Sequence, residues 1–278
     1  MNCKDIQPAN RQKIAIIGPS GTGKTTSIKT LSGKTLLLNW DTDGYRVLAG
    51  EDIDYEDYSS TSLATPVHSV DRFEKDIKRI EMAFNSDTPP YNNIVLDSLT
   101  KCQDVVMDYG IWQTGPVLRG KNAWSRKRIG SFEMAGKPEY GYLIDYTNWL
   151  LDTILSIPCN IIIIGHLQVF EDEKTHVVEH LPLISGRKAP HRFGIPFSEV
   201  YLSEANGMEY TWRTRPRPPA SFMQTRVNHL PTVIPQDFSN LWELMSNPNL
   251  CEEIKSNAIT QTQSTRLPRT PAFTQQCL

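Results

Sequence analysis

A glycine-rich run near the start of the chain has the spacing of a phosphate-binding loop. Residues 18–25 read Gly-Pro-Ser-Gly-Thr-Gly-Lys-Thr and fit the pattern G-x-x-x-x-G-K-[ST]. Glycines let such a loop wrap closely, because they adopt left-handed backbone angles without steric cost. Its N–H groups and the following helix start would present positive charge to phosphate oxygens. The residues predicted to hold the phosphates are Gly18, Ser20, Gly21, Thr22, Gly23, Lys24, Thr25 and Thr26.

Two side chains of this loop, together with a distant carboxylate, predict a nucleoside triphosphate bound with a metal ion. Lys24 would reach the β- and γ-phosphates, and the Thr25 hydroxyl would contact Mg²⁺. Asp97 ends the apolar run 94–97 and would hold the same ion through water. An aspartate at this position could instead cap the next helix. The sequence therefore predicts ATP and Mg²⁺ as ligands, with Thr25 and Asp97 at the metal.

Three further polar residues follow apolar runs and are candidates for the chemistry of hydrolysis. Asp41 and Asp43 follow the run 35–40, and hydrolysis needs a carboxylate that orients or deprotonates water. Asp43 is the first candidate and Asp41 the second, although Asp-x-Asp-Gly also makes an ordinary turn. His166 closes the run 160–166, where it would contact the γ-phosphate or serve as a structural histidine. The predicted catalytic residues are thus Lys24, Asp43, Asp97 and His166.

The segment 112–137 is basic and contains few acidic residues. Its basic and aromatic side chains are Arg119, Lys121, Trp124, Arg126, Lys127 and Arg128. Such side chains neutralise phosphates and stack on unpaired bases, so they are the predicted nucleic-acid contacts. A solvated loop with one anchoring tryptophan would have the same composition. A second basic group, Arg187, Lys188 and Arg192, would bind DNA or reach the ATP of a neighbouring subunit.

The stretch His176 to His180 matches the inverted zinc-protease pattern H-x-x-E-H. That chemistry needs a helix that places both histidines on one face. The two central valines and the Leu181-Pro182 that follows favour a strand, so metal binding is not expected here.

The elements that must position these residues are predicted from apolar patterning. Continuous apolar runs are typical of a parallel sheet covered on both faces, and they occur at 13–17, 35–40, 93–97 and 160–166. Helical spacing or helix-start residues predict helices at 27–31, 71–84, 98–109, 140–154 and 238–245. Two hairpins are predicted, at 168–178 and at 198–213, the second turning at Asn206-Gly207. We expect residues 1–11 to be a tail, 12–250 one domain, and 256–278 a disordered tail.

Composition limits the classes of function. The chain has 278 residues and a formal net charge of −2, so contact with nucleic acid requires a local basic patch. Five dispersed cysteines indicate reduced thiols. The polar N-terminus resembles no signal peptide, and the apolar runs are too short to span a bilayer. These features predict a cytoplasmic protein (in the host cytoplasm if phage-encoded) that does not contact a membrane.

The combination of segments 18–26, 41–44, 94–100 and 161–166 resembles the RecA-like P-loop ATPases. The nearest resemblance is to phage-type nucleotide-binding recombination proteins, which include single-strand annealing and recombinase-like members. This resemblance implies an α/β RecA-like P-loop NTPase fold, with a mainly parallel sheet flanked by helices and C-terminal β-hairpins. It also implies that Asp43 activates water, that His166 senses the nucleotide, and that loops 110–138 and 167–180 bind DNA.

Three functions agree with the sequence. The leading one is a Mg²⁺-dependent ATPase that acts on single-stranded DNA in recombination or replication, as a homo-oligomer. Its C-terminal tail would then recruit a single-strand-binding or replication protein. The second is a P-loop kinase for a small molecule, in which the basic stretch forms a lid. The third is an ATP-binding scaffold that does not hydrolyse.

Overall fold

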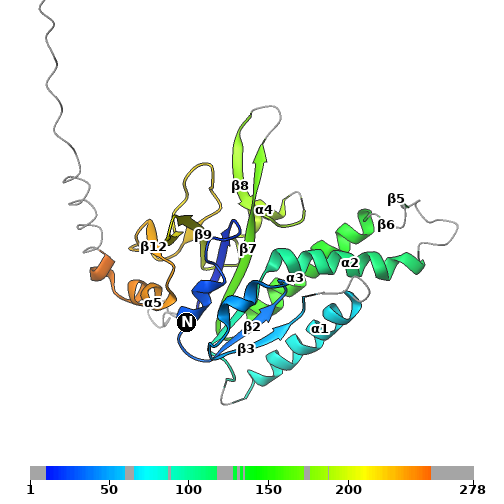
Figure 1. The fold of residues 1–278 in the computed structure, drawn as a ribbon, viewed down its shortest axis with the longest axis horizontal. Coiled ribbons are helices and arrows are strands. Elements are labelled where there is room, and N and C mark those ends of the chain that lie inside the picture. Colours follow the sequence, from blue (N-terminus) through cyan, green and yellow to red (C-terminus); the bar gives the residue numbers. More distant parts are fainter. Residues whose placement is uncertain are drawn as a thin grey trace, which may run out of the picture.

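The computed structural model describes residues 11–59, 66–86, 89–117, 128–129, 132–133, 135–171, 176–186 and 188–251. Both predicted tails lie outside these residues, apart from Arg11. The described part forms a ten-stranded mixed sheet flanked by helices (Figure 1). The predicted fold class is therefore confirmed.

The four predicted apolar runs are neighbouring strands at the centre of the sheet. The strand order is β12-β10-β9-β1-β7-β4-β2-β3. The strands that pair in parallel around the centre are β1 (Lys13–Gly18), β7 (Asn160–Glu171), β4 (Asn93–Asp97), β2 (Thr35–Asn39) and the edge strand β3 (Ile53–Asp57). Because these strands are parallel, their carboxyl ends meet at one edge, where open α/β sheets bind ligands.

The other half of the sheet is largely antiparallel. β9 (Glu199–Asn206) pairs in parallel with β1 and then forms a hairpin with β10 (Glu209–Arg213). β12 (Val233–Pro235) lies beyond β10, and β11 (Gln224–Thr225) also pairs with β9. β7 forms the other predicted hairpin with β8 (Val178–Pro182), which projects from the body of the molecule (Figure 1).

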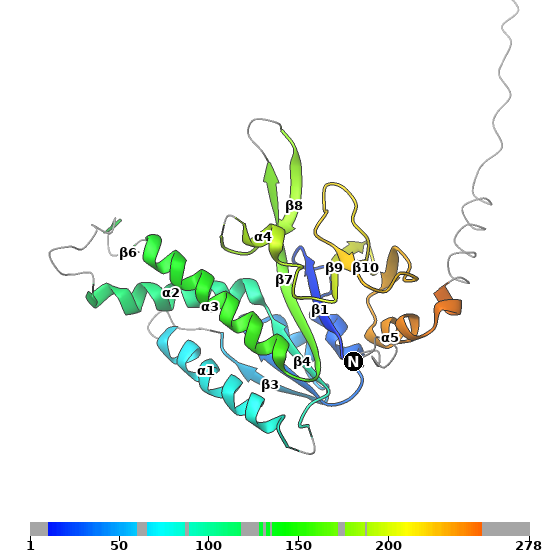
Figure 2. The ribbon, with the colours of Figure 1, turned by 180° about the vertical axis from the view of Figure 1, so that it is seen from behind.

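Helices cover both faces of the sheet. α1 (Pro66–Ala83), α2 (Leu99–Val117) and α3 (Lys137–Ser156) pack against one face (Figure 2). The other face is covered by α5 (Phe238–Ser246) and by two 3₁₀ helices, η2 (Thr26–Thr30) and η3 (Gly44–Leu48). Alternate residues of each central strand enter opposite layers, as strand geometry requires. Asp237 caps α5 as predicted, accepting a hydrogen bond from the Asn240 N–H.

Three local predictions were wrong. The segment after the glycine-rich loop forms a five-residue 3₁₀ helix, which is too short for much of the expected helix-dipole charge. α2 does not end near Tyr109 but runs through Gly110 to Val117, and the Tyr142 ring of α3 packs directly against that glycine. β7 does not end at His166 but continues to Glu171, since β8 pairs with it. The basic stretch also contains two short paired strands, β5 (Arg128–Ile129) and β6 (Phe132–Glu133).

Candidate nucleotide-binding site

Strand register brings the sequence-predicted residues to one edge of the sheet. Gly18, at the end of β1, lies opposite His166 of β7. Asp97, at the end of β4, lies between Ile164 of β7 and Asn39 of β2. The backbone N–H groups of Trp40 and Asp41 both donate to the Asp97 carbonyl oxygen. The glycine-rich loop, Asp97, His166 and Asp41 therefore meet at one edge of the parallel strands, where β1, β4 and β2 end and β7 continues past His166.

The loop has the backbone that its glycines permit. Gly21 and Gly23 have φ angles of +78° and +81°, in the region that L-residues rarely adopt. The Thr22 hydroxyl donates to the Pro19 carbonyl oxygen across the loop, over 2.9 Å. These contacts curl residues 18–25 into a compact turn after β1, as the phosphate-binding pattern requires.

Lys24 lies inside the loop. Its ammonium donates to the carbonyl oxygens of Pro19 (2.6 Å) and Gly18 (3.0 Å), and the residue is only 6% exposed. Burial lowers the pKa of Lys24 to about 8, and the negative charges of Asp97 and Asp41 partly oppose this shift. The side chain is therefore mostly charged at neutral pH, and it supplies a fixed cation for phosphate oxygens.

The next residue connects the loop to β4. The Thr25 hydroxyl donates to Oδ2 of Asp97 over 2.6 Å. Burial raises the pKa of the Asp97 carboxyl to about 6, and the Thr25 hydrogen bond and Lys24 act in the opposite direction. The ionised carboxylate is thus costly to bury here, unless a cation is bound beside it.

A hydroxyl oxygen next to a carboxylate oxygen fits Mg²⁺. This ion takes one or two protein ligands and completes its octahedron with substrate phosphates and water. Within the described residues no group of three or more His, Cys, Asp or Glu side chains forms an all-protein metal cage. Within the H-x-x-E-H stretch, His180 lies on strand β8, so the prediction of a strand here is confirmed. Thr25 and Asp97 would therefore bind Mg²⁺ together with a bound triphosphate.

The two aspartates after β2 differ in their surroundings. The Asp43 side chain is 66% exposed and forms a 2.9 Å ion pair with Arg46. Asp41 is half-buried; its negative charge opposes the lowering of the Lys24 and His166 pKa values that burial causes, and it adds to the burial-driven rise in the Asp97 pKa. The partial burial of Asp41 and the exposed ion pair of Asp43 therefore favour Asp41 as the carboxylate at the site.

His166 is half-buried beside the loop. Its backbone N–H donates to the Thr100 hydroxyl (3.0 Å), and its carbonyl oxygen accepts from the Leu183 N–H (2.8 Å). Burial, followed by the charge of Lys24, lowers the pKa of the imidazole. A neutral imidazole at physiological pH presents one donor and one acceptor nitrogen, which suits contact with a phosphate oxygen.

A cavity of about 640 Å³ borders the loop on the His166 side. Its lining includes Pro19 and Ser20 of the loop, His166 and Gln168 of β7, and Lys101 and Asp104 of α2. The cavity is large enough for a small molecule or for a side chain from another subunit.

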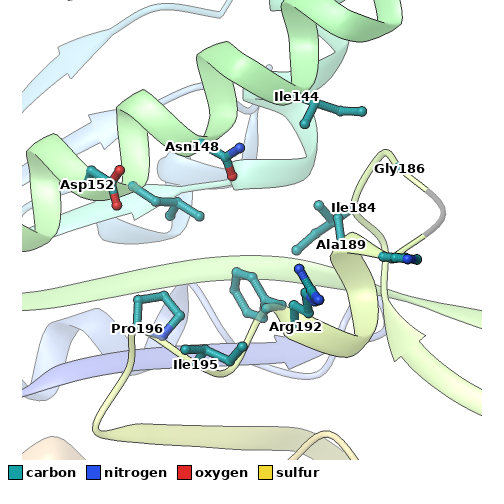
Figure 3. Close-up of a pocket in the computed structure, with 12 residues that line it drawn as sticks. Ile144, Asn148, Asp152, Ile184, Gly186, Ala189, Arg192, Ile195 and Pro196 are labelled. Atoms are coloured by element: carbon teal, nitrogen blue, oxygen red, sulfur yellow. The ribbon is translucent and has the colours of Figure 1, made fainter.

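A second cavity, of about 460 Å³, lies away from the loop between α3 and the α4 region (α4, Ala189–Arg192). Figure 3 shows Ile144, Asn148 and Asp152 of α3 on one side and Arg192 with Ile195 on the other. Lys188 also lines it, so Lys188 and Arg192 of the second basic group border this cavity and not the glycine-rich loop. Arg187 lies outside the described residues.

The predicted nucleic-acid contacts are largely beyond what the structure describes. Arg119, Lys121, Trp124, Arg126 and Lys127 lie outside the described residues. Arg128 begins β5, without a described side chain. The DNA interface therefore stays a prediction.

The residues of β9, β10 and the segment before α5 that contact the glycine-rich loop were not predicted from the sequence. The Ser203 hydroxyl of β9 and the Gln236 side-chain amide both donate to the Thr22 carbonyl oxygen, each over 2.9 Å. Tyr210 of β10 packs against Gly23. The one signal in the sequence is Ser203, a small polar residue that directly follows the apolar run 200–202.

The fold and this loop define a P-loop nucleotide-binding protein. A model of the family described as an AAA domain matches residues 10–214, which is most of the chain. The chain therefore belongs to this AAA domain family of P-loop ATPases. No curated protein matches it significantly. Among the described residues, none of the helices has the length and apolar character needed to cross a membrane.

Proposed function

We propose that the protein is a Mg²⁺-dependent ATPase that acts on single-stranded DNA in phage-type recombination or replication. The observation that carries the ATPase part is the Thr25–Asp97 hydrogen bond, which joins the loop to a strand-end carboxylate. That pair, with Lys24 beside it, has the arrangement that P-loop enzymes use for a triphosphate and its metal.

Each residue at the sheet edge has a defined task in this proposal. The N–H groups of the loop and the Lys24 ammonium bind phosphate oxygens. Asp41 orients the attacking water and accepts its proton. His166 donates a hydrogen bond to a γ-phosphate oxygen, and it transmits the loss of that contact to β8 through Leu183. When bound, Mg²⁺ neutralises charge on the phosphate oxygens.

The DNA part of the proposal rests on the arrangement of α2. This helix begins directly after Asp97 and Ser98, and the basic segment 112–137 starts in its C-terminal part. Basic and aromatic side chains in one segment suit the backbone and bases of single strands. Assembly into a homo-oligomer and recruitment of a replication protein through residues 256–278 belong to the same proposal.

One observation favours a second candidate, a small-molecule kinase. The cavity of about 640 Å³ adjoins Ser20 and His166, where the γ-phosphate would lie, and it would accommodate a phosphate acceptor. In an oligomeric ATPase the same space would receive an arginine from the neighbouring subunit.

Phosphate release from ATP, measured with and without single-stranded DNA, separates these functions. Strong stimulation by DNA supports the proposal. Turnover that appears only with a small acceptor supports the kinase. Tight ATP binding without turnover under any condition would support a scaffold and contradict the proposal.

A further inference from the structure

The strand order predicts the orientation in which a nucleotide would lie along the edge of the sheet. The residues that face the γ-phosphate and metal, Asp97, His166 and Asp41, come from β4, β7 and the end of β2, all on one side of β1. β9, β10 and β12 lie on the other side of β1. A triphosphate held along the loop with its γ end at Asp97 therefore directs its sugar and base toward β9 and β10.

An aromatic side chain is already present on that side. Tyr210 pairs with Ala205 in the β9–β10 hairpin and packs against Gly23 of the loop. A Cβ atom added to Gly23 would lie 2.8 Å from Cδ1 of the Tyr210 ring. The residue is nonetheless 43% exposed, and in the described part of the chain it stacks on no other ring. The ring thus contacts the loop while a large part of the residue remains accessible.

The position of Tyr210 is set by hydrogen bonds between the loop and the hairpin. The Gln236 amide donates to the carbonyl oxygen of Thr22 in the loop (2.9 Å) and to that of Thr211 in β10 (3.0 Å). It also contacts the Ser203 hydroxyl of β9 (2.8 Å), which itself donates to Thr22. Gln236 therefore ties the residue next to Tyr210 to the residue next to Gly23. A site held this way pays little ordering cost when a ligand binds.

We propose that Tyr210 is the base-stacking residue of the nucleotide site, receiving the purine ring of the bound nucleoside triphosphate on its exposed face. This inference rests on the proposed nucleotide-binding function. Stacking uses the π-face that every base has, so it predicts similar contributions to ATP and GTP binding. Tyr210 acts on affinity for the base, whereas Lys24 and Asp97 act on the phosphates and the metal.

The test compares two triphosphate ligands, one that carries a nucleoside and one that does not. Affinities of the full-length protein for ATP and for inorganic tripolyphosphate are measured by calorimetry with Mg²⁺ present. We expect Tyr210→Ala to weaken ATP binding by about 10-fold or more, the range of one base–aromatic stack, and to leave tripolyphosphate binding unchanged. Tyr210→Phe should bind ATP as the wild type does. Tyr140→Ala, which removes an exposed tyrosine from α3, is the matched control and should change neither affinity.

A second variant separates stacking from support of the loop. Tyr210→Leu keeps an apolar side chain against Gly23 but lacks a π-face, so it should lose ATP affinity like Tyr210→Ala. Unchanged ATP affinity in both variants overturns the inference. Equal losses for ATP and tripolyphosphate also overturn it, because Tyr210 would then only support the loop. If the wild-type protein binds neither ligand, the nucleotide site itself is contradicted. If it binds tripolyphosphate as tightly as ATP, only the base subsite is contradicted.

Discussion

The Thr25 hydroxyl and the Asp97 carboxylate are hydrogen-bonded over 2.6 Å, although 72 residues separate them in the sequence. This bond joins the loop after β1 to the end of β4, with only β7 between the two strands. Two hard oxygen atoms at this position, beside a buried lysine, form the part of the molecule that binds phosphate and Mg²⁺ in our account.

Asp97→Asn should abolish the effect of Mg²⁺ on ATP binding. The amide keeps the size of the side chain and can accept the Thr25 hydrogen bond, but it lacks the negative charge that attracts the ion. Mg²⁺ titration of ATP affinity in both proteins measures this. Asp54→Asn, at an exposed carboxylate in the first half of β3, is the control. Equal Mg²⁺ dependence in Asp97→Asn and the wild type would contradict the metal assignment.

The same substitution should stabilise the protein when metal and nucleotide are absent. Burial raises the pKa of Asp97 from its ordinary value of 3.8 to about 6, so the folded state binds a proton more tightly than the unfolded chain. The wild type therefore loses stability as pH rises from 4 to 6. In EDTA, Asp97→Asn should be more stable by up to about 3 kcal/mol at pH 7 and by much less at pH 4. Denaturant unfolding at both pH values measures the difference in the free energy of unfolding between the two proteins. If this difference is the same at pH 4 and pH 7, the prediction is wrong.

Asp41 and Asp43 form a matched pair for locating the water-activating carboxylate. Asp41→Asn should lower kcat by about 10²-fold or more, the usual contribution of a general base, with little change in ATP affinity. Asp43→Asn should leave kcat within about 2-fold, since the loss of an exposed ion pair has a small effect. Steady-state ATPase assays distinguish them. A large loss in Asp43→Asn alone would restore the ranking expected from the sequence.

The basic segment provides a test of DNA binding. Combined alanine substitution of Arg119, Lys121, Arg126 and Lys127 should weaken single-strand binding and flatten its salt dependence. Each phosphate contact that is lost removes about 0.7 from the slope of log K against log salt. A control with the same charge change replaces Lys34, Lys75, Lys78 and Arg79, which are exposed elsewhere. If the salt slope is the same in the wild type and the first variant, DNA binds at another surface.

The site could be predicted from sequence where its signals are local. The glycine spacing of 18–25 and the carboxylate ending 93–97 are short patterns, and parallel strands place their ends together. The choice between Asp41 and Asp43 could not be predicted, because it depends on the turn after β2 and on Arg46, which pairs with Asp43. Ser203 and Gln236 reach Thr22 across 181 and 214 residues of sequence, and no local pattern predicts such contacts.

In the fold, too, the elements with local sequence patterns were predicted, and those that depend on contacts with other elements were not. Continuous apolar runs predicted the central strands, because parallel strands are buried on both faces. The hairpin at 168–178 was predicted, but not that its first strand continues β7 without a break past His166, since this outer half is exposed and depends on pairing with β8. The end of α2 was also missed, because Gly110 is tolerated through close packing with α3 rather than through helix propensity.

The central claim is that the loop around Lys24 binds the triphosphate, and ATP binding by Lys24→Ala tests it most directly. With Mg²⁺ present, we predict that the wild type binds and hydrolyses ATP. Lys24→Ala should remain folded, because the substitution removes a charge that is costly to bury. The variant should bind ATP at least about 10-fold more weakly, as expected for the loss of a charge-assisted hydrogen bond. It should not hydrolyse ATP. ATP binding and turnover equal to those of the wild type would contradict the account.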